Sequence, residues 1–238
     1  MSSVDTLLGQ AIALVNTGAR PAARALCEQA VRGHPPHPAV HQLLALLCLQ
    51  DGDAEAAGRH ADLSMALRPD HGPTLLVAGD AARARGALAM AMAFHRRARD
   101  ILPDRPDAAW ALALTAIAST DGVAAERALG SVVALQPDHA DAWFRLALLR
   151  QDRRDWDGAA TALRQVLALQ PERVEAEVNL GIVLQDAGHT EEALRAYGRA
   201  FRRRPETFGR IAHALAAAPH GEVWLDLDGL RRVLAETR

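Results

Sequence analysis

Residues 174–207 read VEAEVNLGIVLQDAGHTEEALRAYGRAFRRRPET, and the pattern of this stretch decides the fold. When residues are placed at about 100° intervals, Leu180, Gly181 and Leu184 form one stripe along a first helix. Gly188 can take the left-handed conformation that ends this helix, and Pro205 stops a second one. The stretch therefore predicts two helices joined by a tight turn and packed along that stripe.

The same pattern recurs along the chain at a constant step of 34 residues, without insertion or deletion. Its closing prolines are Pro35, Pro69, Pro103, Pro137, Pro171 and Pro205. An acid follows five of them and is predicted to cap the next helix and meet the positive end of its dipole. Small residues hold two more slots, where they let helices approach closely. These slots are Ala11, Ala45, Gly79, Ala113, Ala147 and Gly181, then Ala23, Ala57, Ala91, Ala125, Ala159 and Ala193.

This pattern resembles the tetratricopeptide repeat family, whose members combine these slots with a 34-residue period. The best match is Leu180, Gly181, Leu184, Gly188, Ala193, Tyr197, Ala200 and Pro205. Ala61 and His95 depart from the aromatic slot, and the turns near Thr120 and Arg154 lack the usual glycine. The resemblance implies an all-α, right-handed superhelical solenoid of six repeats, which are 4–37, 38–71, 72–105, 106–139, 140–173 and 174–207.

Residues 208–238 are predicted to form a C-terminal cap, because a solenoid needs an atypical terminal unit over its last apolar face. A first helix is expected from Phe208 to Ala217, with a break at Pro219 and a short helix from Val223 to Glu236. Its apolar face is expected to comprise Leu227, Leu230 and Leu234. This helix is expected on the final helix around Phe208, Ile211 and Leu215, with a groove of its own or a neighbouring molecule as the alternative.

A second stripe of each first helix lies about a third of a turn from the packing stripe, and in this family it lines the concave surface. The resemblance therefore implies that a partner binds there. Most of this stripe is apolar, and aromatic residues with a nearby arginine have the composition of a binding hot spot. The candidate residues are Leu76, Asp80, Arg83, Trp110, Leu114, Ile117, Phe144, Arg145, Leu148, Val178, Asn179 and Ile182. The alternative is that neighbouring first helices bury much of this stripe against each other.

Some family members hold a terminal carboxylate with Lys or Arg plus Asn on successive first helices. The chain has no lysine, and Asp80, Arg83, Arg145 and Asn179 do not reproduce that set. Asn179 also stands alone at its slot, so an asparagine ladder is not expected either. A carboxylate clamp is therefore disfavoured.

Catalytic chemistry is not indicated by any motif in the chain. The 27 basic residues are all arginine, which excludes a Walker-type phosphate loop and a Schiff-base lysine. His34, His37 and His41 cluster without a Cys, Asp or Glu partner, so neither a metal site nor a cofactor is predicted. The arginine run 202–204 suits the negative end of a helix dipole. A formal net charge of −2 gives no broad basic surface for nucleic acid.

The expected location is the cytoplasm of a bacterium. Only Cys27 and Cys48 are present, the opening MSSVDTLLGQ lacks the pattern of a signal peptide, and no apolar run is long enough to span a membrane. Arginine in place of lysine, with abundant alanine, suggests a GC-rich bacterial genome. The predicted function is a non-catalytic adaptor that binds an apolar or amphipathic segment of a protein partner. The alternatives are a self-assembling architectural protein (a dimer or filament) and a regulatory subunit of a transferase-type enzyme.

Overall fold

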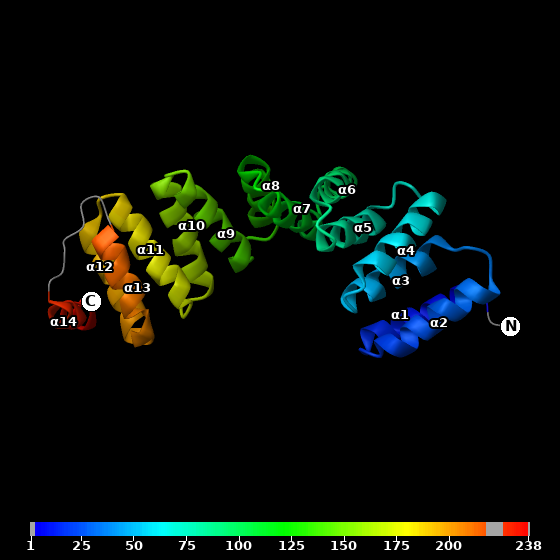
Figure 1. The fold of residues 1–238 in the computed structure, drawn as a ribbon, viewed down its shortest axis with the longest axis horizontal. Coiled ribbons are helices and arrows are strands. Elements are labelled where there is room, and N and C mark those ends of the chain that lie inside the picture. Colours follow the sequence, from blue (N-terminus) through cyan, green and yellow to red (C-terminus); the bar gives the residue numbers. More distant parts are fainter. Residues whose placement is uncertain (1–2, 218–225, 238) are drawn as a thin grey trace. The chain divides into compact units, whose positions relative to one another are not determined.

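The computed structural model describes residues 3–217 and 226–237 (Figure 1). Every regular element in these ranges is helical, as the sequence predicts. In chain order, the helices begin with α1 (Val4–Asn16), α2 (Arg20–Gly33), α3 (Pro38–Gln50), α4 (Ala54–Leu67), α5 (Gly72–Ala84), α6 (Leu88–Ile101), α7 (Pro106–Ala118) and α8 (Gly122–Leu135). The odd-numbered helix of each pair is the first helix of its repeat, and the even-numbered one is the second. They are followed by α9 (Ala140–Asp152), α10 (Trp156–Leu169), α11 (Val174–Asp186), α12 (Thr190–Arg203), the 3₁₀ turn η1 (Pro205–Thr207), α13 (Phe208–Ala217) and α14 (Leu227–Glu236).

Helix starts repeat the 34-residue step of the prolines. The odd-numbered helices α1 to α11 begin at residues 4, 38, 72, 106, 140 and 174, and each even-numbered helix begins 16 residues after its partner. Four of the turns inside these pairs place a glycine at positive φ, at Gly18, Gly52, Gly86 and Gly188. Thr120 and Arg154 take the same left-handed conformation, at φ 56° and 61°. The turn geometry is therefore kept even where the glycine is missing, at a cost of about 1–2 kcal/mol per residue.

Helix capping differs from the sequence prediction. The acids after the prolines do not cap α5, α7, α9 and α11, because the N-cap is the next residue, namely His71, Arg105, His139 and Arg173 respectively. Carboxylate caps occur instead on second helices. Asp53 accepts a hydrogen bond from the Ala56 amide at 2.9 Å, and Asp155 accepts one from the Gly158 amide at 3.0 Å. Asp70 lies outside the cap and pairs with Arg97 of α6.

The chain divides into two compact units, residues 1–128 and 129–238, with the boundary inside α8. In the first unit, helices pack within the pairs α1/α2, α3/α4 and α5/α6 and also between consecutive pairs. In the second unit, α9 packs on α10, α10 on α11, and α11 on α12. Each unit has its own alanine-rich core, because small side chains at fixed slots let the helices approach closely.

The C-terminal segment packs on the second unit. Helix α13 has the predicted bounds Phe208–Ala217. Helix α14 packs on α12 instead of on α13, where it was expected, and reaches α13 through Arg231, whose guanidinium lies 4.4 Å over the ring of Phe208. Leu230 and Leu234 are fully buried in the same core as Tyr197 and Ile211. The predicted apolar face was wrong for Leu227, which is 50% exposed, because α14 turns its later leucines toward α12. Residues 223–225 of the predicted helix lie outside the described ranges.

The end of α14 is held by one arginine of the run 202–204. Arg202 donates from Nη1 to the carbonyl of Leu234 at 3.2 Å and also to that of Thr237. A Cβ at Gly198 would lie 2.9 Å from the Leu234 oxygen, so glycine allows this close approach. At the other end, the side chain of Asp226 caps α14. Among the described residues, no helix combines the length and the hydropathy needed to cross a membrane.

Candidate functional site

A hollow of about 450 Å³ lies on the first-helix side of unit 1, between α3, α5 and α7. Its lining comprises Gln42, Leu46, Leu49, Pro73, Leu76, Val77, Asp80, Arg83, Arg105, Asp107, Trp110, Ala111 and Leu114. We call it the unit-1 hollow. It brings together five predicted site residues, which are Leu76, Asp80, Arg83, Trp110 and Leu114. The sixth residue predicted in this unit, Ile117, is half-buried on α7 outside that lining.

The charged groups of the unit-1 hollow are paired with one another. Arg83 Nη2 lies 2.8 Å from Asp80 Oδ1, and Arg105 Nε lies 2.9 Å from Asp107 Oδ1. The hydrogen bond from Arg105 holds the pKa of Asp107 below its usual range, and burial opposes this effect. Two arginines and two aspartates leave the rim without net charge. The apolar residues therefore dominate what this hollow offers a ligand.

A buried histidine supports the hollow from below. His95 of α6 is fully buried, with Nδ1 2.8 Å from Thr115 Oγ1 and Nε2 3.3 Å from the Leu76 carbonyl oxygen. The Thr115 hydroxyl donates its proton to the Ala111 carbonyl oxygen at 3.0 Å, so its oxygen is left to accept. Burial lowers the pKa of His95, although Asp80 Oδ1, 3.8 Å from Nε2, acts in the opposite direction. The imidazole thus links α5, α6 and α7 beneath the first-helix side.

A second hollow of about 500 Å³ lies between α9, α11 and α13 in unit 2, and we call it the unit-2 hollow. It is lined by Phe144, Leu148, Gln151, Asp152, Glu175, Asn179, Ile182 and Arg210. Four of these, Phe144, Leu148, Asn179 and Ile182, are predicted site residues. Val178 is buried and lines a smaller neighbouring hollow, and Arg145 is half-buried on α9 outside these linings.

Two arginines of the unit-2 hollow region were missed by the sequence analysis. The guanidinium of Arg173 lies 4.3 Å over the ring of Phe144, in cation–π geometry. Arg210 of α13 donates from Nη2 to Asn179 Oδ1. Arg173 precedes α11 and Arg210 follows η1, so neither falls on the second stripe of the first six repeats. No spacing rule in the sequence signals these contacts.

Comparison with family models decides the assignment. One tetratricopeptide repeat model matches residues 8–72 and 110–171, and another matches residues 148–218. The chain belongs to the tetratricopeptide repeat family. No curated protein sequence matches it.

Solved structures of other tetratricopeptide proteins share this fold. The crystal structure of YrrB, titled "a TPR protein with an unusual peptide-binding site", is 18% identical, covers 79% of this chain and 96% of its own, and gives a TM-score of 0.71. A MamA crystal structure is 20% identical, covers 71% of this chain and 93% of its own, and gives 0.66. Pseudomonas aeruginosa pilF is 15% identical, covers 85% and 92%, and gives 0.70. At these identities the likeness concerns the fold alone.

Two histidines at the first junction of the tetratricopeptide array have partners that the sequence analysis did not identify. His37 Nε2 lies 3.9 Å from Asp5 Oδ1. His41 is buried, and its Nδ1 lies 3.2 Å from Nδ1 of His60 on α4, with the two rings stacked. Burial lowers the pKa of both rings. Within the described ranges, no three His, Cys, Asp or Glu side chains are placed to hold a metal ion. The sequence analysis did not identify His60, which lies 19 residues from His41 on the next helix.

The two cysteines and the arginine run 202–204 of the tetratricopeptide chain have partners or positions that belong to the fold. Cys27 and Cys48 are free thiols in the core, and burial raises the pKa of Cys27 to about 11. Arg203 donates to the Pro171 carbonyl, and Arg204 Nη1 lies 2.8 Å from Glu175 Oε1. Arg202 of α12 donates to carbonyls at the end of α14, so each arginine of the run 202–204 has a partner inside the chain.

Proposed function

We propose that this chain is a non-catalytic interaction scaffold that binds an apolar or amphipathic segment of a protein partner on its first-helix side. The observation that carries the proposal is the unit-1 hollow, where leucines and Trp110 form the surface and each described charge on the rim has an intramolecular partner. A ligand that relied on charge would have to compete with these intramolecular ion pairs. A ligand that buried aliphatic side chains would gain about 25 cal/mol per Å² of apolar surface.

The unit-2 hollow supports the same mode of binding. Phe144 and Ile182 are half-buried, and Leu148 is 37% exposed. Binding energy at protein interfaces concentrates in a few aromatic and arginine anchors. Phe144 under Arg173 has that composition, and a helix or extended segment that presents apolar residues at regular spacing suits it.

The proposed setting is the bacterial cytoplasm. Two free cysteines and no disulfide among the described residues suit a reducing compartment, and arginine in place of lysine suits a GC-rich bacterial genome. Purification of the native partner, followed by its identification, separates an adaptor from a regulatory subunit of a transferase. Mass measured against concentration detects self-assembly.

The test selects short random peptides, displayed on phage, for binding to the purified chain. Leu114→Glu places a charge in the unit-1 hollow. Leu63→Glu is the control, because Leu63 is 49% exposed on α4, outside the unit-1 lining. We expect selected apolar peptides to lose at least about tenfold in affinity with Leu114→Glu and to bind Leu63→Glu as they bind the wild type. Equal binding to both variants would refute the proposed site.

A further inference from the structure

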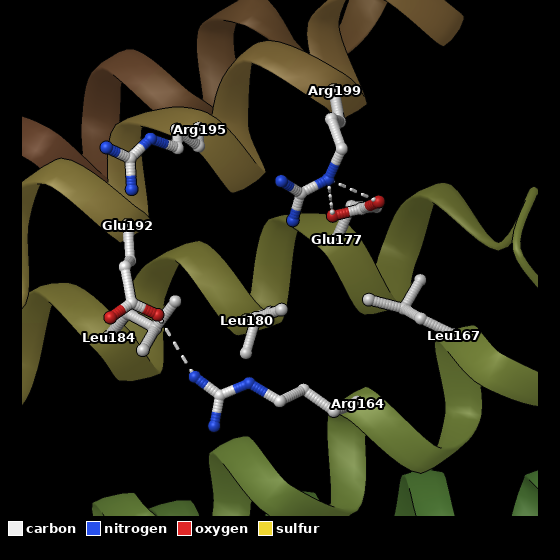
Figure 2. A pocket seen from close by; sticks show the side chains of 8 residues that line it. All are labelled: Arg164, Leu167, Glu177, Leu180, Leu184, Glu192, Arg195 and Arg199. Carbon is white, nitrogen blue, oxygen red and sulfur yellow. Dashed lines mark hydrogen bonds and ion pairs between the residues drawn. The ribbon is translucent and has the colours of Figure 1, made fainter. Parts of the chain in front are cut away.

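A third hollow, of about 370 Å³, lies in unit 2 between α10 and α12 with α11 beneath it, and we call it the second-helix hollow. Leu167 of α10 and Leu180 and Leu184 of α11 form its apolar part (Figure 2). At 100° per residue, Leu180 and Leu184 lie on the face of α11 opposite to Asn179 and Ile182, which line the unit-2 hollow. The second-helix hollow is therefore a separate surface from the one described above.

A buried carboxylate marks this hollow as unusual. Glu177 occupies the first motif slot of its repeat, where the preceding repeats place Leu7, His41, Leu75, Ala109 and Trp143. It is only 4% exposed, and both of its oxygens accept from Arg199 Nε, at 2.9 and 3.0 Å. Burying this carboxylate costs desolvation, although the side chain of its partner Arg199 is 40% exposed. Apolar residues of similar volume often serve folding equally well. Glu177 lies in the first turn of α11, where an acid suits the helix dipole, but packing alone does not require the pair.

The pair holds Arg199 at the edge of the hollow. Glu177 takes Nε, and among the described residues no hydrogen bond in the chain involves Arg199 Nη1 or Nη2. These terminal nitrogens carry four donors that suit a planar carboxylate. Figure 2 shows Leu180 between this pair and the ion pair of Arg164 with Glu192, whose Nη2 and Oε2 lie 3.1 Å apart.

Arg195 supplies the excess positive charge. Its Nη2 lies 3.4 Å from Oε2 of Glu191, a residue that is 89% exposed and is not part of the lining. The lining contains Arg164, Arg195 and Arg199 but only two acids, Glu177 and Glu192, which leaves one positive charge. Leu180 and Leu184 at its floor are buried, and Leu167 is half-buried. A nucleic acid would need a broad basic surface, whereas the chain carries a net charge of −2.

We propose that the second-helix hollow binds an acidic segment of a protein partner, in which an Asp or Glu side chain meets Arg195 and Arg199 and an adjacent leucine-sized side chain packs on the half-buried Leu167. Charge complementarity selects the acid, and contact with Leu167 selects its apolar neighbour. This second surface lets the scaffold hold two segments at once. The inference does not depend on what the first-helix side binds.

The test uses short random peptides displayed by fusion at their C-terminus, so that no free terminal carboxylate is present. We expect the enriched sequences to pair Asp or Glu with Leu or Ile. A synthetic amidated peptide of this kind should lose about tenfold or more in affinity with Arg195→Glu, less with Arg195→Gln, and some affinity at high salt. Arg195 is half-exposed, so both variants should keep the wild-type melting temperature.

Two controls separate this site from the other surfaces. Arg96→Glu reverses an arginine of similar exposure in unit 1, and Leu148→Glu charges the unit-2 hollow. Both should leave the affinity for the acidic peptide unchanged. The inference would be overturned if the enriched sequences contained no acids, or if acidic peptides bound Arg195→Glu with the wild-type affinity. If only Leu148→Glu lowered the affinity for the acidic peptide, the peptide would bind in the unit-2 hollow. That result would also overturn the inference, and it would leave the first-helix proposal intact.

Discussion

The ring of Tyr197 lies directly against the backbone of Gly181, so that a Cβ at Gly181 would stand 2.4 Å from Cε1 of the tyrosine. Tyr197 is fully buried, and its hydroxyl donates to Gln185 Oε1 at 2.9 Å. The same relationship recurs at Gly79, where a Cβ would stand 2.2 Å from His95 Nε2. In both repeats, a ring on the second helix thus packs directly on a glycine of the first helix.

Gly181→Ala should destabilise unit 2, because the added methyl displaces a packed ring. Overpacking of this kind costs about 1–3 kcal/mol, and Gly181→Ile should cost at least as much. Gly9→Ala is the matched control, because nothing lies within 4 Å of a Cβ at Gly9 on α1. That change should instead stabilise by up to about 1 kcal/mol. Thermal unfolding followed by circular dichroism measures both, and equal shifts would contradict the packing described here.

Stability should fall on acidification because buried imidazoles are held neutral. Burial lowers the pKa of His95, with Arg83 acting in the same direction and Asp80 opposing it. The unfolded chain therefore binds more protons than the folded chain below a pH of about 6.5, and stability declines as pH falls through that value. His95→Phe should flatten the dependence of melting temperature on pH between about 7 and 5, whereas His213→Gln, at an exposed position of α13, should not. An unchanged profile for His95→Phe would contradict this assignment.

The ion pair of Glu177 and Arg199 should not be needed for folding. Replacing both with leucine should leave the free energy of unfolding within about 1 kcal/mol of the wild type, or raise it, because burying the Glu177 carboxylate is itself unfavourable and the side chain of Arg199 is 40% exposed. Chemical denaturation measures this. A loss of several kcal/mol would show that the pair stabilises the fold, and the argument for a binding role would then lose its basis.

Helix α14 contains a buried and an exposed leucine, whose replacement by alanine should have different effects on stability. Leu234→Ala should cost about 2–5 kcal/mol, because Leu234 is fully buried against α12. Leu227→Ala on the same helix should change stability by no more than about 0.5 kcal/mol, because Leu227 is half-exposed. Melting temperatures of the two variants decide the matter. Similar losses for both would mean that α14 packs on another face.

The helices of the repeat array follow from the sequence because they depend on local spacing. The bounds of α13 match the prediction, and the all-α fold is confirmed. Contacts between side chains from different helices were not predicted, as with Arg173 over Phe144 and Glu177 with Arg199. Such contacts depend on how far a long side chain reaches across neighbouring helices. Leu227 shows a further limit, since helical spacing identifies a face but not how the helix is turned toward its support.

The central claim is that the first-helix side binds a partner segment through apolar contacts. The most direct measurement is calorimetric titration of a selected apolar peptide into the wild type, Trp110→Ala, Leu148→Glu and Leu169→Glu. Leu148 and Leu169 are 37% and 39% exposed, but only Leu148 lies in the unit-2 hollow. If the peptide binds in the unit-1 hollow, we predict that Trp110→Ala loses about 2 kcal/mol of binding free energy, and if it binds in the unit-2 hollow, we predict this loss for Leu148→Glu. Leu169→Glu should lose none in either case. Wild-type affinity in both hollow variants, with all proteins folded, would contradict the claim.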